Sequence, residues 1–182
     1  VPGVLSDQVL VYRRENLQLI KTITIAGGMA AIGEIVYRDN FLYISRKQQY
    51  DANSVSKYDM DGTLVWRYDV SATVYIDQNE DGILFAIWNG NFGMLSFNGS
   101  LVWSDSLAGF SITDIKATSA YSFSMTGSQN RLSSAVIFEK DGDGYKKIWE
   151  KTSQNIGQYL GAEKSYGYLL IFGNEQGNGV LT

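Results

Sequence analysis

The hydrophobic positions of this chain fall in short runs that alternate with polar turn residues. The runs are rich in Val, Ile, Tyr, Phe and Trp, and Gly, Asn, Asp and Ser separate them. Runs of this length and composition predict β-strands joined by tight turns, whereas the 3.6-residue periodicity of an amphipathic helix is hard to find. The 19 glycines and the single proline agree with many turns and no long helices. The pattern therefore predicts an all-β protein.

One tract of this strand pattern occurs three times. Residues 58–66 (YDMDGTLVW) return as residues 97–103 (FNGSLVW) and, in a longer form, as residues 138–149 (FEKDGDGYKKIW). Each copy has an apolar strand-forming residue, a polar Asp/Asn-Gly turn and an apolar run that ends in Trp. The three tryptophans lie 37 and 46 residues apart, which brackets the roughly 40–50 residues of a β-propeller blade, a four-stranded antiparallel sheet. The repeat therefore predicts a β-propeller.

The strand pattern divides the single predicted domain, residues 1–182, into three full blades and two half-blades. The full blades cover residues 32–68, 73–103 and 112–151, and the half-blades, of two strands each, cover residues 8–25 and 158–173. We expect the two half-blades to join into one blade, because this closes a four-bladed ring and removes exposed sheet edges. The alternative is a fragment of a larger propeller of about seven or eight blades.

The tryptophans that end the three copies are Trp66, Trp103 and Trp149. Because they hold one fixed place in the repeat, we expect them to pack between blades, where large aromatic side chains bury much apolar area. The alternative role for the same side chains is stacking against a ligand.

The charge and composition of the chain exclude several classes of function. The formal net charge is -4, from 15 basic and 19 acidic residues, and the basic residues form no patch or stripe that would suit nucleic acid. The chain has no Cys and no His, which removes disulfides, Cys/His zinc sites, Ser-His-Asp triads and cysteine nucleophiles. We therefore expect no enzyme activity, no resident cofactor other than calcium, and no nucleic-acid partner.

The sequence also bears on where the protein works. No stretch approaches the roughly 18 uncharged apolar residues of a membrane helix, so we expect no membrane span. The abundance of Ser, Asn, Tyr and Gly favours an extracytoplasmic protein, secreted or on the cell surface. The chain begins at Val1 rather than Met, and we expect a processed or excised product, by loss of a signal peptide or by a cut from a longer protein.

The tract Asp77-Gln-Asn-Glu-Asp-Gly82 matches the start of a calcium loop, with Asp77, Asn79 and Asp81 as the candidate ligands. Calcium takes about six to eight hard oxygen ligands, and alternate carboxylates on a tight Gly turn can point inward together. The twelfth position, where an EF-hand has a bidentate Glu, is Trp88. The alternative is an ordinary polar turn, for which Asp, Asn and Gly are favoured by their backbone conformations.

Two further features bear on recognition. Asn98-Gly-Ser100 is a glycosylation sequon on a predicted turn, so Asn98 is a candidate for modification. Several tyrosines fall near predicted loops or strand ends, where exposed Tyr suits protein or sugar contacts, and half-buried strand Tyr is the alternative. These residues are Tyr50, Tyr75, Tyr121, Tyr159 and Tyr166.

Residues 82–103 resemble the quinoprotein-type (pyrroloquinoline-quinone-like) propeller repeat, in which a Gly-x-Leu-Tyr-Ala-Leu strand precedes a Gly turn and a terminal Leu-x-Trp. The end motif returns in residues 61–66, whereas the third copy has Ile148 before its Trp and the first half-blade has Ile20 where Trp is expected. The resemblance implies a propeller. The family includes quinone-dependent dehydrogenases, non-catalytic outer-membrane assembly lipoproteins and many cell-surface proteins. Its dehydrogenases usually hold the quinone beside a vicinal disulfide, which a chain without cysteine cannot form.

These observations together predict a non-catalytic β-propeller module of a secreted or cell-surface protein. We expect it to serve protein–protein interaction or structural assembly, with a protein partner or further copies of the chain. A carbohydrate-binding or host-attachment domain, with a glycan as ligand, is the first alternative. A fragment of a quinone-dependent dehydrogenase-like propeller is the second.

Overall fold

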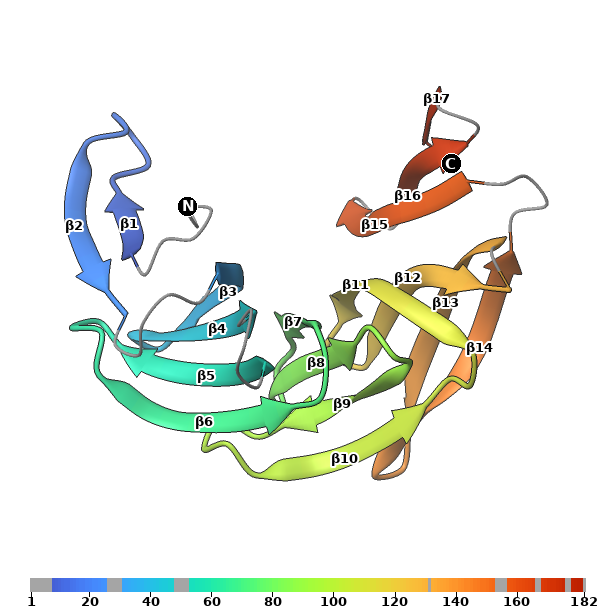
Figure 1. The fold of residues 1–182 in the computed structure, drawn as a ribbon, viewed down its shortest axis with the longest axis horizontal. Coiled ribbons are helices and arrows are strands. Elements are labelled where there is room, and N and C mark those ends of the chain that lie inside the picture. Colours follow the sequence, from blue (N-terminus) through green and yellow to red (C-terminus); the bar gives the residue numbers. More distant parts are fainter. Residues whose placement is uncertain are drawn as a thin grey trace. The chain divides into compact units, whose positions relative to one another are not determined.

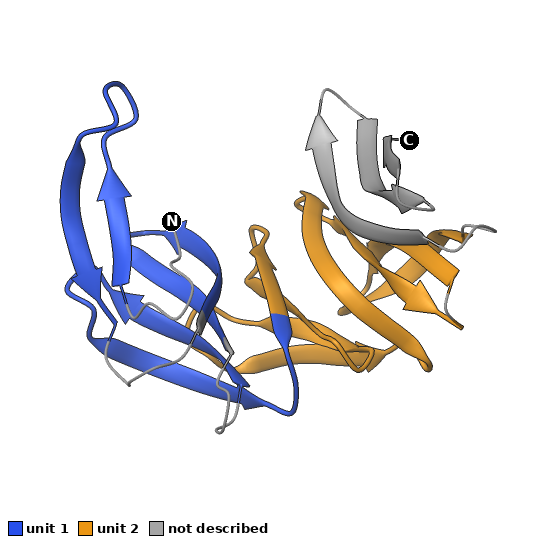
Figure 2. Cartoon of the chain, turned by 45° about the horizontal axis from the view of Figure 1, so that its top comes forward, with its two compact units in different colours: residues 1–74 blue, residues 75–182 orange. Residues whose placement is uncertain are grey.

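The computed structural model describes residues 8–25, 31–47, 53–130, 132–152, 157–165, 168–175 and 178–181, with side chains between residues 8 and 152 except at positions 31 and 47. In this part of the chain every regular element is a β-strand (Figure 1). Accordingly, the described residues include no helix of the length and apolarity that a membrane crossing requires. The chain divides into two compact units, residues 1–74 and 75–182 (Figure 2).

The first unit contains a two-stranded and a four-stranded antiparallel sheet. β1 (Gln8–Tyr12) pairs with β2 (Leu19–Thr24). The larger sheet has its strands side by side in chain order: β3 (Ala31–Arg38), β4 (Phe41–Lys47), β5 (Asn53–Asp59) and β6 (Leu64–Val70). This order places β6 at the edge of the sheet.

The second unit holds two four-stranded sheets and one three-stranded sheet, again with neighbouring strands in chain order. The first sheet comprises β7 (Val74–Gln78), whose first residue ends the preceding unit, β8 (Ile83–Ile87), β9 (Asn91–Leu95) and β10 (Leu101–Ser106). The second comprises β11 (Phe110–Ser119), β12 (Ser122–Gln129), β13 (Leu132–Asp141) and β14 (Gly144–Thr152). The third comprises β15 (Gly157–Ser165), β16 (Tyr168–Glu175) and β17 (Asn178–Leu181). β10 and β14 therefore lie at sheet edges.

The predicted all-β fold of four-stranded antiparallel sheets is confirmed. The C-terminal segment contains one strand more than the sequence pattern indicated, because β17 pairs with β16. This strand is only four residues long and two of them are Asn and Gly, so its apolar signal is too short to be recognised. The single domain and the closing of a ring by the two half-blades stay predictions.

A β-bulge recurs in the outermost hairpin of each sheet whose side chains are described. In these hairpins the strand register shifts by one residue, which leaves one residue of the outer strand without a partner across the ladder. The bulged residues, one each in β2, β6, β10 and β14, are Ile20, Val65, Val102 and Ile148. The bulge therefore belongs to the repeat.

The register of β1 and β2 corrects the alignment of the first half-blade. The sequence placed Ile20 in the position of the repeat tryptophan, whereas in the structure Lys21 lies opposite Val11 as Trp66 lies opposite Lys57. The turn between β1 and β2 is longer than the turn between β5 and β6, so counting from the preceding tyrosine gave the wrong residue. Ile20 is the bulged residue of its strand.

The core of the second unit lies between its two four-stranded sheets. All five residues of β8 are buried, as expected for a near-continuous apolar strand covered on both faces. Phe92, Phe123 and Phe138 come from three strands, and their ring centroids are 5.0 to 6.0 Å apart. This spacing is in the range of favourable aromatic pairs. The aromatic cluster therefore joins the two sheets.

The first unit has a smaller core of its own. Ile23, Leu42 and Ile44 are among its buried side chains and come from both of the unit's sheets. The buried Arg46 donates from Nη1 to the Tyr58 hydroxyl at 2.9 Å, which provides a partner for its charged group.

Candidate functional site

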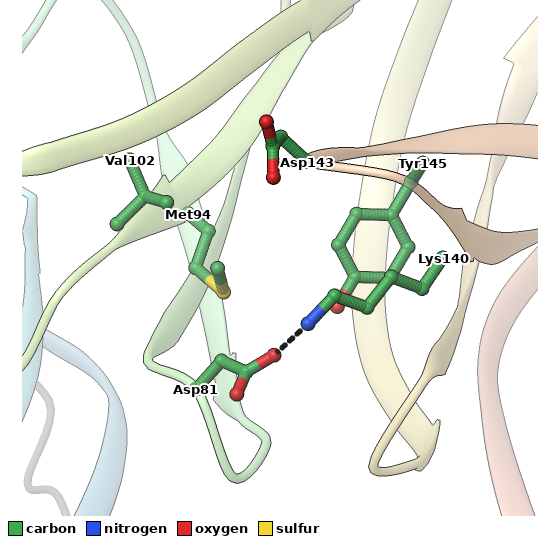
Figure 3. Close-up of a pocket in the computed structure, with 6 residues that line it drawn as sticks. All are labelled: Asp81, Met94, Val102, Lys140, Asp143 and Tyr145. Atoms are coloured by element: carbon green, nitrogen blue, oxygen red, sulfur yellow. Dashed lines mark hydrogen bonds and ion pairs between the residues drawn. The ribbon is translucent and has the colours of Figure 1, made fainter.

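A groove of about 440 Å³ opens between the two four-stranded sheets of the second unit. One side is formed by Met94 of β9 and Val102 of β10, and the other by Lys140 of β13 and Tyr145 of β14 (Figure 3). The remaining lining residues come from two turns: Asp81 from the turn between β7 and β8, and Asp143 from the turn between β13 and β14.

The β7–β8 turn owes its shape to the side chain of Asn79. Asn79 Oδ1 accepts hydrogen bonds from the backbone N–H groups of Asp81 and Gly82, each at 3.0 Å. This is an Asx turn, in which the side-chain amide replaces a backbone acceptor. On its other side, Asn79 Nδ2 donates to the Tyr145 hydroxyl at 3.0 Å. One buried amide thus shapes the turn and links it to the neighbouring sheet.

The two carboxylates of the groove differ in whether they form an ion pair. Lys140 Nζ lies 2.6 Å from Asp81 Oδ2, and this hydrogen bond raises the pKa of the lysine. Burial raises the pKa of the Tyr145 phenol, so the hydroxyl stays protonated at neutral pH. The carboxylate of Asp143 makes neither a hydrogen bond nor an ion pair with any described residue, and it is exposed. The groove therefore carries one unbalanced negative charge.

The three candidate calcium ligands have separate partners. Asp77 Oδ2 accepts from the backbone N–H of Ala117 at 2.8 Å, Asn79 shapes its turn, and Asp81 pairs with Lys140. Among the described residues, no three acidic side chains lie together in an arrangement that could hold a metal ion. These contacts favour the polar-turn interpretation, and calcium binding stays a prediction. A calorimetric titration with calcium would test it, since a real site gives a saturable heat that vanishes in the Asp81→Asn variant.

The repeat tryptophans occupy different surroundings. Trp66 packs against Tyr43 with ring centroids 5.9 Å apart. Trp103 contacts Phe92, Phe123 and Tyr145 at centroid distances of 5.0 to 6.0 Å. Trp149 is 38% exposed on β14. Trp103 thus contacts the neighbouring sheet, whereas Trp66 contacts a strand of its own sheet, and packing between blades stays a prediction for Trp66 and Trp149.

The other candidate recognition residues differ in how far they are exposed. Asn98 is exposed in the β9–β10 turn and accepts from the Ser100 backbone N–H at 3.2 Å, and its glycosylation stays a prediction. Tyr121 is 61% exposed in the turn before β12, whereas Tyr75 is half-buried and packs against the core. Tyr50 and Tyr166, and the side chain of Tyr159, lie outside the described residues.

The sequence pointed to part of this groove and missed the rest. Asp81 was singled out as a metal ligand, and Asp143 belongs to a recognised Asp-Gly hairpin turn. Lys140 and Tyr145 gave no signal, because their roles depend on contacts with the preceding sheet, 59 and 66 residues away along the chain. Asn79 was singled out as a metal ligand and not for its role in the turn, although an Asn two residues before an Asp-Gly pair is a recognisable Asx-turn signal.

Replacing Asn79 with alanine is expected to lower the free energy of unfolding by about 2 kcal/mol, because it leaves two turn N–H groups without their acceptor. Denaturant unfolding of the purified chain measures this loss. Glu80→Ala is the matched control, since Glu80 is exposed in the same turn, and it should change the stability by less than about 0.5 kcal/mol. Equal losses in the two variants would contradict the role given to the Asn79 amide.

Comparison with known proteins identifies the fold and nothing finer. No known protein family and no curated protein matches the sequence. Among solved structures, the chain is similar to the computationally designed Ika8 protein (TM-score 0.72, 12% identity, 98% of this chain and 53% of the other). It is also similar to BamB from Moraxella catarrhalis (TM-score 0.63, 12% identity, 97% and 52%). A third similar structure is the β-propeller domain of Cps50 (Swd1) from Myceliophteria thermophila (TM-score 0.53, 11% identity, 98% and 80%).

These similarities show that the chain has a β-propeller fold. The chain spans about half the length of Ika8 and of BamB. At these identities the likeness concerns the fold alone, and the resemblance to the quinoprotein-type repeat stays a prediction.

Proposed function

We propose that this chain is a non-catalytic β-propeller module that binds a protein partner, within a secreted or cell-surface protein. One observation carries the proposal: every bulged outer strand exposes a pair of consecutive apolar side chains. Their exposed fractions lie between 38% and 57%. The pairs are Leu19 and Ile20, Leu64 and Val65, Leu101 and Val102, and Ile148 and Trp149.

In β2 and β6 the bulge explains why two successive side chains are exposed, whereas β10 and β14 also expose longer runs of residues beyond their bulges. In a regular strand, neighbouring side chains point to opposite faces, so one of the two would be buried. An extra residue interrupts that alternation and turns a second apolar side chain outward. Single exposed leucines need no explanation, but an apolar pair at the same repeat position in three strands does. In β14 the position before the bulge holds Lys147, and the bulged Ile148 is exposed together with Trp149 after it.

The location of these pairs favours a protein as the partner. β6, β10 and β14 lie at sheet edges, and natural edge strands are usually protected by charged residues. β10 has the sequence Leu-Val-Trp-Ser-Asp-Ser, whose one charged residue is Asp105, whereas β6 and β14 each carry both basic and acidic residues. An apolar edge strand offers side-chain contacts together with backbone hydrogen bonds, which is the basis of recognition by strand addition.

The proposal of a non-catalytic role is supported by the composition. The chain has no Cys and no His, and its described surface exposes large apolar side chains. A glycan ligand is the alternative, for which exposed aromatic turn residues such as Trp88 and Tyr121 are the candidates.

The test compares outer-strand and turn variants in partner capture. The immobilised chain is cross-linked to surface or secreted proteins of its source, and the captured proteins are quantified. Three forms of the chain are compared: the parent, the Tyr121→Ser variant and an outer-strand variant. The outer-strand variant carries four substitutions, Leu64→Ser, Val65→Ser, Leu101→Ser and Val102→Ser. We expect the captured partner to be lost in the outer-strand variant and kept in Tyr121→Ser. Loss in Tyr121→Ser alone, together with binding on a glycan array, would replace the proposal by glycan recognition.

A further inference from the structure

We propose that the groove between the two four-stranded sheets of the second unit receives an arginine side chain of the protein partner. This inference rests on the proposed function and names the chemistry that the partner presents. It starts from three properties of the groove: one carboxylate that no described residue pairs with, an apolar side wall, and direct continuity with an exposed outer strand.

The charge of the groove selects a cation. Asp81 and Lys140 already neutralise one another across 2.6 Å. Asp143 is left as a carboxylate that no described residue pairs with, on an exposed turn at the rim (Figure 3). An anionic ligand would have to displace Asp81 from Lys140 and would meet Asp143 as a like charge. A cationic ligand finds an open carboxylate and leaves the existing ion pair intact.

The shape and lining of the groove favour arginine over a compact cation. The half-exposed Val102, backed by the buried Met94, gives an apolar surface on which the methylene stem of a long side chain can lie. A planar guanidinium can then meet the Asp143 carboxylate through two parallel N–H···O bonds, a geometry that an ammonium does not have. The Tyr145 ring adds an aromatic surface, to which a guanidinium is attracted. The volume of about 440 Å³ is sufficient for one side chain of this length.

The groove is continuous with the proposed interaction surface. Val102 lines the groove and is also the bulged residue of the exposed pair on β10. A partner segment that contacts Leu101 and Val102 therefore has the groove directly beside it. We infer that the partner combines an apolar contact on β10 with an arginine that enters the groove.

The probe for this inference is N-acetyl-arginine methylamide, with N-acetyl-citrulline methylamide as the matched ligand. Citrulline has nearly the same shape but replaces the charged guanidinium by a neutral urea. Titration of the isotope-labelled chain is followed by amide NMR shifts. We expect saturable shifts at the groove residues with the arginine probe and an affinity for the citrulline probe that is about fivefold lower, as for one solvent-accessible ion pair.

The role of Asp143 is tested with the Asp143→Asn variant, and Asp105→Asn is its control. Asp143 lies in an exposed turn, where asparagine is equally suited to the backbone, so the variant should fold normally. Asp105 is exposed on β10 outside the groove and undergoes the same change of charge. We expect Asp143→Asn to lower the affinity for the arginine probe about fivefold, to that of the citrulline probe, and Asp105→Asn to leave it unchanged.

Three results would overturn the inference: equal affinities for the two probes, equal effects of the two variants, or shifts confined to residues outside the groove. The proposed function is judged separately, by partner capture. If the arginine probe fails while the outer-strand variant still loses its partner, the groove inference is wrong and the proposed function stands. If the probe binds as expected while the outer-strand variant keeps its partner, the site is real but the proposed interaction surface is wrong.

Discussion

Replacing Phe123 with alanine is expected to lower the free energy of unfolding by about 4 kcal/mol. Phe123 is fully buried and stacks on Phe138 with an interplanar angle of 8° and a centroid distance of 5.1 Å. It also contacts Phe92 of the neighbouring sheet and Trp103 of the outer strand. The substitution removes the ring that these side chains share, and the surrounding strands are too rigidly paired to close the cavity.

Chemical denaturation of the protein, followed by tryptophan fluorescence, measures the loss in the free energy of unfolding. Tyr121→Ala is the control, because it removes an aromatic ring two residues earlier that is 61% exposed, and it should change the stability by less than about 1 kcal/mol. If Phe123→Ala costs no more than Tyr121→Ala, the aromatic cluster does not join the two sheets as described.

Replacing Gly93 with alanine is expected to cost about 3 kcal/mol, although it adds only one methyl group. The new Cβ would lie well inside van der Waals contact with the Trp103 backbone carbonyl, and 2.9 Å from the nearest atom of the Phe85 ring. The carbonyl belongs to the neighbouring strand and cannot move without disturbing the ladder. The change should therefore separate β9 from β10 and displace the Phe85 ring.

Gly144→Ala provides the matched comparison for Gly93→Ala. A Cβ at Gly144 meets no atom within 4 Å, and its backbone does not have a positive φ. This substitution should be neutral or stabilise the protein by up to about 1 kcal/mol, since alanine restricts the unfolded chain. Thermal unfolding of both variants under one condition tests the pair. A similar midpoint for the two would mean that β9 and β10 are not packed as closely as the structure shows.

The strands and their grouping could be predicted because they depend on local patterns. Alternation of apolar and polar residues, Gly-containing turns and the recurring Trp mark strands and turns through the local order of residues alone. The bulges could not be predicted in the same manner. A run such as Leu64-Val65 has the same appearance in a regular strand and in a bulged one, since only the partner strand shows that one residue is unpaired.

Of the groove residues, the sequence could place only those that lie in turns with a recognisable local sequence. Asp-Gly and Asn-x-Asp-Gly sequences indicate turns from local conformation, so Asp81 and Asp143 fell in the expected elements. The calcium hypothesis assumed that Asp77 and Asp81 point to one centre. In the structure Asp77 accepts from a backbone N–H of β11, and Asp81 pairs with a lysine of β13. Partners of this kind are fixed by the packing of sheets, which a single sequence does not display.

Because the bulge recurs, the orientation of each outer strand does not depend on the length of the turn before it. The turns before the four outer strands cover residues 13–18, 60–63, 96–100 and 142–143, and so differ threefold in length. Nevertheless each outer strand exposes a neighbouring apolar pair at its bulge. A bulged side chain has no partner across the ladder and makes few core contacts, so it can be exchanged without repacking the interior. Evolution can therefore alter the contact chemistry of one blade at a time, through Ile20, Val65, Val102 or Ile148, while the scaffold remains the same.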